Sequence, residues 1–226
     1  MFVLLAGYGI LRPKIDSSVK SNVTQGNKEM VAVNEPNNKP LETLTLDPDM
    51  YVSYTDINQL VKNADFIVEG KVTDVSYFDF NTATNTTLSI EVTKSYNSNI
   101  KNGQILTFVE PGGITTKAAL INYSGNKFNE PIGETEKNTK VQVLIAGAPL
   151  TKINENVLLF AKEGTLNALP QKYYVSIGAF QGKFIINGDS IGRYVPKGME
   201  LGKYSSLNMS KADFDQKLSE AVKNKK

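Results

Sequence analysis

Two glycine-containing stretches close to lysines are the parts of this chain that most resemble ligand-binding loops. Pro111-Gly112-Gly113 precedes Lys117, and its backbone N–H groups would suit an anion. A strand end that needs a positive φ explains these glycines more simply, and we favour it. Residues 178–183 superficially suggest a phosphate-binding loop, but Phe184 stands where the hydroxyl belongs and strands flank the stretch, so we predict an ordinary turn.

Because the chain has no Cys, no His and no Trp, catalysis would have to use Asp, Glu, Lys, Tyr or Ser, and carboxylates are the candidates for metal binding. These absences exclude Cys/His zinc sites, Fe–S clusters and triads that use an imidazole base. The acids that lie near one another are Asp47 with Asp49, and Glu130 with Glu134 and Glu136. Neither set has EF-hand spacing, so we interpret them as scattered surface acids. The sequence predicts no catalytic residue, no metal site and no cofactor.

Aromatic residues occur in two short runs that could form a platform for a glycan or a peptide. The runs are Tyr77 to Phe80 and Tyr173-Tyr174. Since neighbouring side chains of a strand point to opposite faces, we expect at least one member of each pair in the core.

Alternating apolar residues predict the elements that would position these groups. Phe66, Val68, Gly70 and Val72 share one face of a strand, and the apolar phase shifts before Val75, which predicts a bulge near Thr73–Asp74. Similar patterns predict further strands, with a long excursion over 114–140. The predicted strands lie in residues 65–80, 88–96, 104–110, 141–147, 155–162, 172–180, 182–188 and 191–196.

Helical periodicity appears only at the two ends of this region. Residues 54–64 carry an apolar stripe with Thr55 as the expected cap, and residues 210–226 carry another with Ser210 and Asp213 as a capping box. Strands joined by turns predict a mainly β fold, a small antiparallel OB-like barrel with short N-terminal and C-terminal helices. A β-sandwich is the alternative.

The N-terminal part has a different composition. Residues 1–11 are uncharged and apolar but too short to span a bilayer, so we interpret them as the remnant of a signal or membrane anchor. Residues 12–50 contain four prolines and no sustained periodicity, which predicts a flexible linker. Residues 51–226 are the predicted barrel domain. An apolar N-terminal segment followed by a flexible linker indicates an extracytoplasmic protein that is membrane-associated or secreted.

Four stretches between Asn63 and Gly188 carry a resemblance to a known group of proteins. They read NADFIVEGKVTDVSYF, LSIEVTKSYNSNIKNGQILTFVEPGG, NENVLLFAK and IGAFQGKFIING. In this order they resemble an uncharacterised family of Gram-positive extracytoplasmic proteins with an OB-like barrel. The chain departs from the family pattern at Asn154-Glu155 and at Ala161. The resemblance implies an envelope protein and implies no activity.

Three functional hypotheses follow from these features. The leading one is a non-enzymatic cell-envelope domain that binds a protein, a peptide or a wall component, with membrane contact through the N-terminus. The alternative is a carboxylate-based hydrolase of envelope glycans, which needs two acids facing each other across a cleft. A nucleic-acid-binding OB domain needs a basic, aromatic groove, and a formal charge of +2 disfavours it.

Overall fold

Five of the predicted strands close into a barrel because each of them contributes apolar side chains to one interior. In the computed structural model, an antiparallel meander is formed by β2 (Phe66–Phe80), β3 (Ala83–Ser95) and β4 (Ile105–Pro111). β4 pairs in parallel with β8 (Tyr174–Ser176). Antiparallel pairings of β8 with β7 (Asn156–Glu163) and of β7 with β2 then close the barrel. The mainly β, OB-like barrel is therefore confirmed, and the β-sandwich alternative is not observed.

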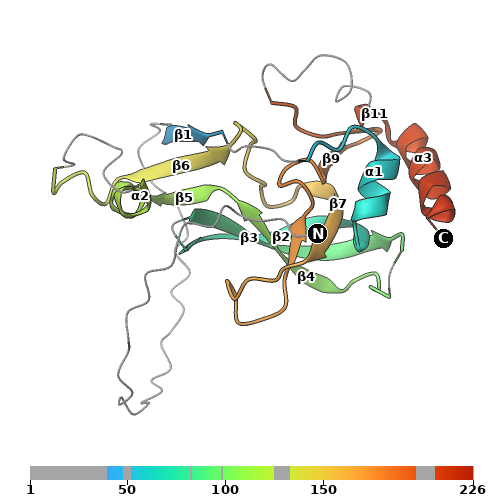
Figure 1. Ribbon diagram of the computed structural model, residues 1–226, viewed down its shortest axis with the longest axis horizontal. Coiled ribbons are helices and arrows are strands. Elements are labelled where there is room, and N and C mark those ends of the chain that lie inside the picture. The colour runs from blue at the N-terminus through green and yellow to red at the C-terminus, as the bar shows by residue number, and fades with distance from the viewer. Residues whose placement is uncertain are drawn as a thin grey trace, which may run out of the picture. The chain divides into compact units, whose positions relative to one another are not determined.

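The structure describes residues 40–47, 52–81, 83–97, 99–124, 133–196 and 207–225. Residues 1–11 and most of the predicted linker lie outside these ranges. The elements, as labelled in Figure 1, are β1 (Glu42–Leu46), α1 (Ile57–Asn63), β2 (Phe66–Phe80), β3 (Ala83–Ser95), β4 (Ile105–Pro111), β5 (Gly113–Thr116), α2 (Lys117–Ser124), β6 (Lys140–Ile145), β7 (Asn156–Glu163), β8 (Tyr174–Ser176), β9 (Lys183–Asn187), β10 (Ser190–Gly192), β11 (Met209–Ser210) and α3 (Lys211–Asn224).

The interior of the barrel is filled from all five strands. The buried side chains are Val68, Val72, Leu88, Ile90, Val92, Leu106, Phe108, Val157, Leu159, Ala161 and Tyr174. Gly70 lets β2 and β3 approach closely, since a Cβ there would lie 2.5 Å from Ile90 Cγ2. The register shifts between Val72 and Asp74, which confirms the predicted bulge, and shifts again between Glu69 and Gly70.

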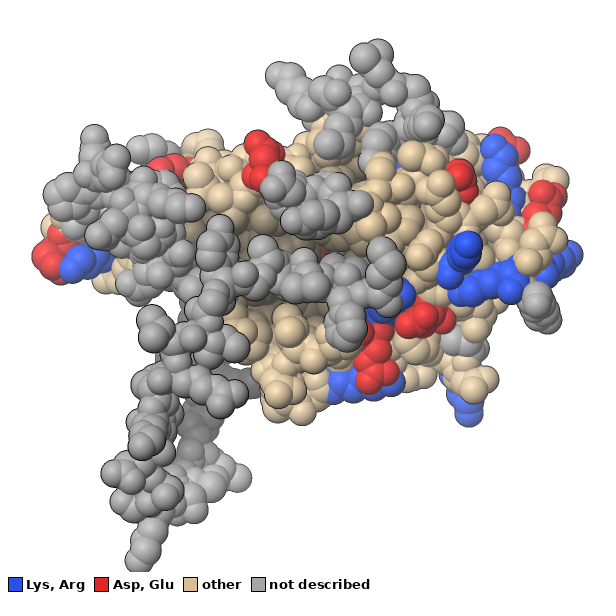
Figure 2. Space-filling view, viewed as in Figure 1, with Lys and Arg blue, Asp and Glu red and all other residues tan. Residues whose placement is uncertain are grey.

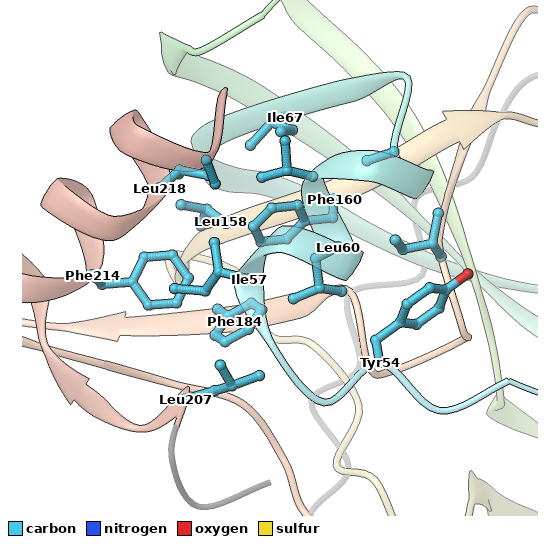
Figure 3. Packing of buried hydrophobic residues seen from close by; sticks show 14 of the residues in the cluster. Tyr54, Ile57, Leu60, Ile67, Leu158, Phe160, Phe184, Leu207, Phe214 and Leu218 are labelled. Atoms are coloured by element: carbon cyan, nitrogen blue, oxygen red, sulfur yellow. The ribbon is translucent and has the colours of Figure 1, made fainter. Parts of the chain in front are cut away.

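A second core lies outside the barrel, where α1 and α3 pack against β7 and β9 (Figure 3). Figure 3 shows Leu158, Phe160 and Phe184 of the strands facing Leu60 of α1 and Phe214 of α3. β7 is buried on both faces, which explains its unbroken apolar run. The terminal helices therefore cover one side of the barrel.

Two details of the helix caps test the sequence reading. Ser210 caps α3 by accepting from the backbone N–H of Asp213, as predicted. The predicted cap of α1, Thr55, is wrong by one residue: Asp56 accepts from the N–H of Gln59. Thr55 has another role, because its own N–H donates to the Gln59 side chain at 2.9 Å.

A second sheet of three strands, with the helix beside it, departs from the predicted organisation in two places. Its order is β1-β6-β5, and β1 pairs in parallel with β6. β1 falls within the range predicted as linker, 12–50, so the linker prediction is wrong for this strand, while residues 12–39 lie outside the described part. The predicted excursion over 114–140 contains most of β5, together with α2 and the start of β6.

Candidate functional site

The interior of the barrel turns from apolar to polar at one end. Leu106, Phe108 and Glu110 alternate along β4 and therefore share its inner face. Thr86 of β3 lies opposite Glu110, and Tyr77 of β2 lies opposite Thr86. The carboxyl group of Glu110, the hydroxyl of Thr86 and the phenol of Tyr77 thus come next to the apolar side chains of the interior.

Lys183 of β9 reaches Glu110 and forms an ion pair with it. Its Nζ lies 2.7 Å from Glu110 Oε2 and 2.7 Å from the hydroxyl of Thr151, in the loop between β6 and β7. Thr151 in turn donates to Glu110 from its backbone N–H at 3.1 Å and from its Oγ1 at 2.9 Å. We call Glu110, Thr151 and Lys183 the barrel-end triad.

The barrel-end triad is largely removed from water. The Lys183 and Glu110 side chains are 11% and 12% exposed, and Thr151 is buried. Burial raises the pKa of the Tyr77 phenol, and the nearby charge of Glu110 raises it further. The triad therefore joins three segments that are distant in the sequence at a single low-dielectric site.

Backbone strain gathers beside the barrel-end triad. Ala146 and Ala179 both adopt positive φ, 51° and 56°, in the turns that follow β6 and β8. Tyr194 connects these turns: its hydroxyl donates to the carbonyl of Ala146, and its ring packs edge-on against Phe180. Strained non-glycine residues are maintained only where the surrounding structure fixes them, and they often mark functional sites.

A groove opens next to this strained region along one face of β9. It has a volume of about 560 Å³, and Lys183, Ile185 and Asn187 of β9 line it. Leu150, Tyr194 and Met209 are among the residues around them. A smaller hollow of about 20 Å³ lies beside it, and Lys183 lines both. We call the larger hollow the β9 groove.

A second charged cluster lies where α3 meets the barrel. Lys211 contacts Glu69 at 2.7 Å and Asp215 at 2.6 Å, and Tyr96 donates to these carboxylates. Burial opposes the charge of Lys211, but its two carboxylate partners outweigh that effect and raise its pKa. Burial likewise works against ionised Asp215, yet the hydrogen bonds from Lys211 and Tyr96 lower its pKa. This cluster holds α3 in place.

The glycine stretches behave as the sequence indicated. Gly112 has a φ of 93°, and its N–H donates to the carbonyl of Thr84, so that N–H is not available to an anion. Residues 178–182 form the turn between β8 and β9. Within it, Gln181 is buried and its side chain accepts from the N–H of Tyr54. Both stretches therefore have structural roles.

The aromatic runs follow the prediction only in part. Tyr173 and Tyr174 are both buried, which confirms the core interpretation for this pair. In the other run, Phe78 and Phe80 are only half-buried and Tyr77 is 39% exposed, so the core interpretation is wrong there. The hairpin of β2 and β3 extends beyond the closed barrel, which explains this exposure.

The acids considered for metal binding do not come together in the described ranges. No group of three or more His, Cys, Asp or Glu side chains that could hold a metal occurs among the described residues. Glu134 is paired with Lys137, and Asp49 and Glu130 lie outside those ranges. Acidic and basic side chains are interspersed on the face shown in Figure 2.

Comparisons with known proteins give no further assignment. No protein-family model matches the chain, and no curated protein matches it. The resemblance to Gram-positive envelope proteins therefore stays a prediction. Within the described part of the chain, no helix has the length and apolar character needed to cross a membrane.

The barrel-end triad and the β9 groove were not anticipated. Glu110 interrupts an inward-facing apolar alternation, and this was the available signal. Lys183 carried no comparable signal, because its partner lies 73 residues away in the sequence. Only the closed barrel brings the two together.

Proposed function

We propose that this chain is a non-enzymatic binding domain of the bacterial cell envelope and that its ligand occupies the β9 groove. The single observation that carries the proposal is the groove itself. Its volume of about 560 Å³ falls within the range of small-ligand sites, and it combines aliphatic side chains with a few polar groups. Its place at the end of a small barrel is also a common position for a ligand.

The envelope location is supported by the sequence alone. Residues 1–11 are apolar, residues 12–39 have a linker-like composition, and the resemblance is to extracytoplasmic proteins. Fractionation of the native organism tests this part. We expect the protein in the membrane or wall fraction, and a purely cytosolic distribution would contradict the location.

The rival function, a carboxylate hydrolase, has less support. Hydrolysis of a glycosidic bond uses two carboxyl groups across a cleft, one of them protonated to serve as the acid. Glu110 is already bound by Lys183 and Thr151. Glu69 and Asp215 are bound by Lys211 in the cluster under α3. Glu155 lines the groove, but among the described lining residues no second acid faces it there.

Blocking the groove tests the binding site directly. Asn187 is exposed at the end of β9, so Asn187→Trp adds bulk to the groove without entering the core. Asn102→Trp is the matched control, since Asn102 is exposed in the turn before β4. The full chain and both variants are compared for co-sedimentation with purified cell walls and for retention on a solubilised envelope fraction. Reduced retention of Asn187→Trp alone supports the site, whereas equal retention of all three contradicts it.

A further inference from the structure

The polar groups of the β9 groove indicate the class of ligand, an inference that rests on the proposed function. A lysine ammonium has three N–H donors. Two of those on Lys183 are used by Glu110 Oε2 and Thr151 Oγ1. Among the described residues no other acceptor takes the third, and Lys183 lines the groove. One end of the groove therefore offers a fixed donor to an oxygen atom.

The other end of the groove offers an acceptor. Asn156 pairs with Ile186 across β7 and β9, so Glu155 lies beside Asn187 at the far end of β9 from Lys183. Glu155 is half-buried and lines the groove. Within the described ranges its carboxylate has neither a hydrogen bond nor an ion pair. A cationic group or an N–H donor of the ligand would satisfy it.

The lining around these ends is mixed, because Ser190, Arg193, Tyr194 and Asn208 belong to it together with apolar side chains. Ile185 lies on the same face of β9, and Leu150 and Met209 also line the groove. From Lys183 to Asn187 a strand extends for about 13 Å, the length of roughly four extended residues. Along β9 the groove therefore presents a donor, the apolar side chain of Ile185 and an acceptor, in that order.

We infer that the β9 groove binds an extended peptide of about four residues. A main-chain carbonyl of the peptide accepts from Lys183, an aliphatic side chain lies over Ile185, and a lysine, arginine or terminal ammonium contacts Glu155.

A glycan fits this groove less well. Sugar rings commonly bind by stacking on open aromatic faces, whereas the ring of Tyr194 packs against Phe180 and its hydroxyl is bonded to Ala146. Between the polar ends, the groove face of β9 presents the aliphatic side chain of Ile185.

Selection from a random heptapeptide library on the immobilised full chain tests this inference. We expect enriched sequences to combine a basic residue with a nearby leucine, isoleucine or valine. An enriched peptide, labelled with a fluorophore, is then titrated against Glu155→Lys. We expect its affinity to fall about tenfold or more, since a contact between charges in a partly desolvated groove is replaced by repulsion. A repeated selection on Glu155→Lys should favour acidic residues instead.

Glu91→Lys provides the control for the same change of charge, because Glu91 is exposed on β3 and does not line the groove. Its affinity should match that of the unaltered chain. Thermal melts of all three proteins verify that each is folded. No enrichment, or enriched peptides that bind Glu155→Lys unchanged, would overturn the peptide inference.

A parallel assay distinguishes failure of the peptide inference from failure of the proposed function. Soluble wall fragments and an array of glycans are applied to the isotope-labelled chain, and the amide signals of Ile185 and Asn187 are followed. Shifts with a glycan but with no peptide would refute the peptide and keep the binding site. Absence of shifts with wall fragments, glycans and peptides alike would refute both.

Discussion

Removal of the Lys183 ammonium is the perturbation that most directly tests the role of the barrel-end triad in stability. Lys183→Met keeps much of the side-chain volume and leaves the Glu110 carboxylate, 12% exposed, without its counter-ion. Loss of one partner of a buried pair commonly costs about 3–5 kcal/mol. Glu110 keeps two donors from Thr151, so we expect the lower end, about 3 kcal/mol.

Urea denaturation of the full chain, followed by far-ultraviolet circular dichroism, measures this loss. A domain of this size should also melt roughly 6–12 °C lower, from about 2–4 °C per kcal/mol. Glu110→Gln combined with Lys183→Met should cost less than the sum of the single changes, because the second change removes the charge that the first leaves unpaired.

The exposed pair Lys137–Glu134 supplies the control. The two side chains are 44% and 86% exposed, so Lys137→Met should change stability by less than about 0.5 kcal/mol. A cost for Lys183→Met as small as that of the control would refute the reasoning. Strictly additive single and double changes would show that Lys183 and Glu110 do not interact in solution.

Three further changes test other parts of the fold. Gly70→Ala should destabilise the barrel by about 1–3 kcal/mol, measured by urea denaturation, because its Cβ would lie 2.6 Å from the carbonyl oxygen of Glu91. Asp56→Ala should cost about 1 kcal/mol, and more than Thr55→Ala, if Asp56 is the cap of α1. Lys211→Met should lower the free energy of unfolding at neutral pH, and its difference from the unaltered chain should become smaller in acid. The lowered pKa of Asp215 gives stability that is present above the unfolded value of about 4 and lost as pH falls through the folded value. A gap that stays constant from neutral pH to pH 3 would contradict this assignment.

The barrel could be predicted because its information is local. A period of two along β2, and its phase shift at the bulge, are visible in a few consecutive residues. The stripe of α3 and its Ser210 cap are equally local. The predicted cap of α1 is wrong by one residue because Thr55 and Asp56 are both good caps, and only the backbone geometry decides between them.

The remaining features depend on partners distant in the sequence. β1 is a short edge strand with mostly exposed side chains, and it is ordered by backbone pairing to β6, about a hundred residues later. α2 begins Lys-Ala-Ala-Leu, which places consecutive apolar residues around the helix and gives no stripe. The barrel-end triad likewise requires the closed barrel, since three separate segments supply it.

The same three residues connect the stability of the barrel with the proposed ligand site. A free lysine side chain loses conformational entropy, of the order of 2 kcal/mol, when a ligand fixes it. In the barrel-end triad Glu110 and Thr151 already fix Lys183, so this side-chain entropy is lost on folding and not on ligand binding. The positive φ of Ala146 and Ala179 fits the same logic, because both alanines are held in the turns beside the triad and the groove. A stable core next to a prearranged donor is the arrangement expected of a rigid binding site, in which affinity depends on the fit of the ligand rather than on movement of the protein.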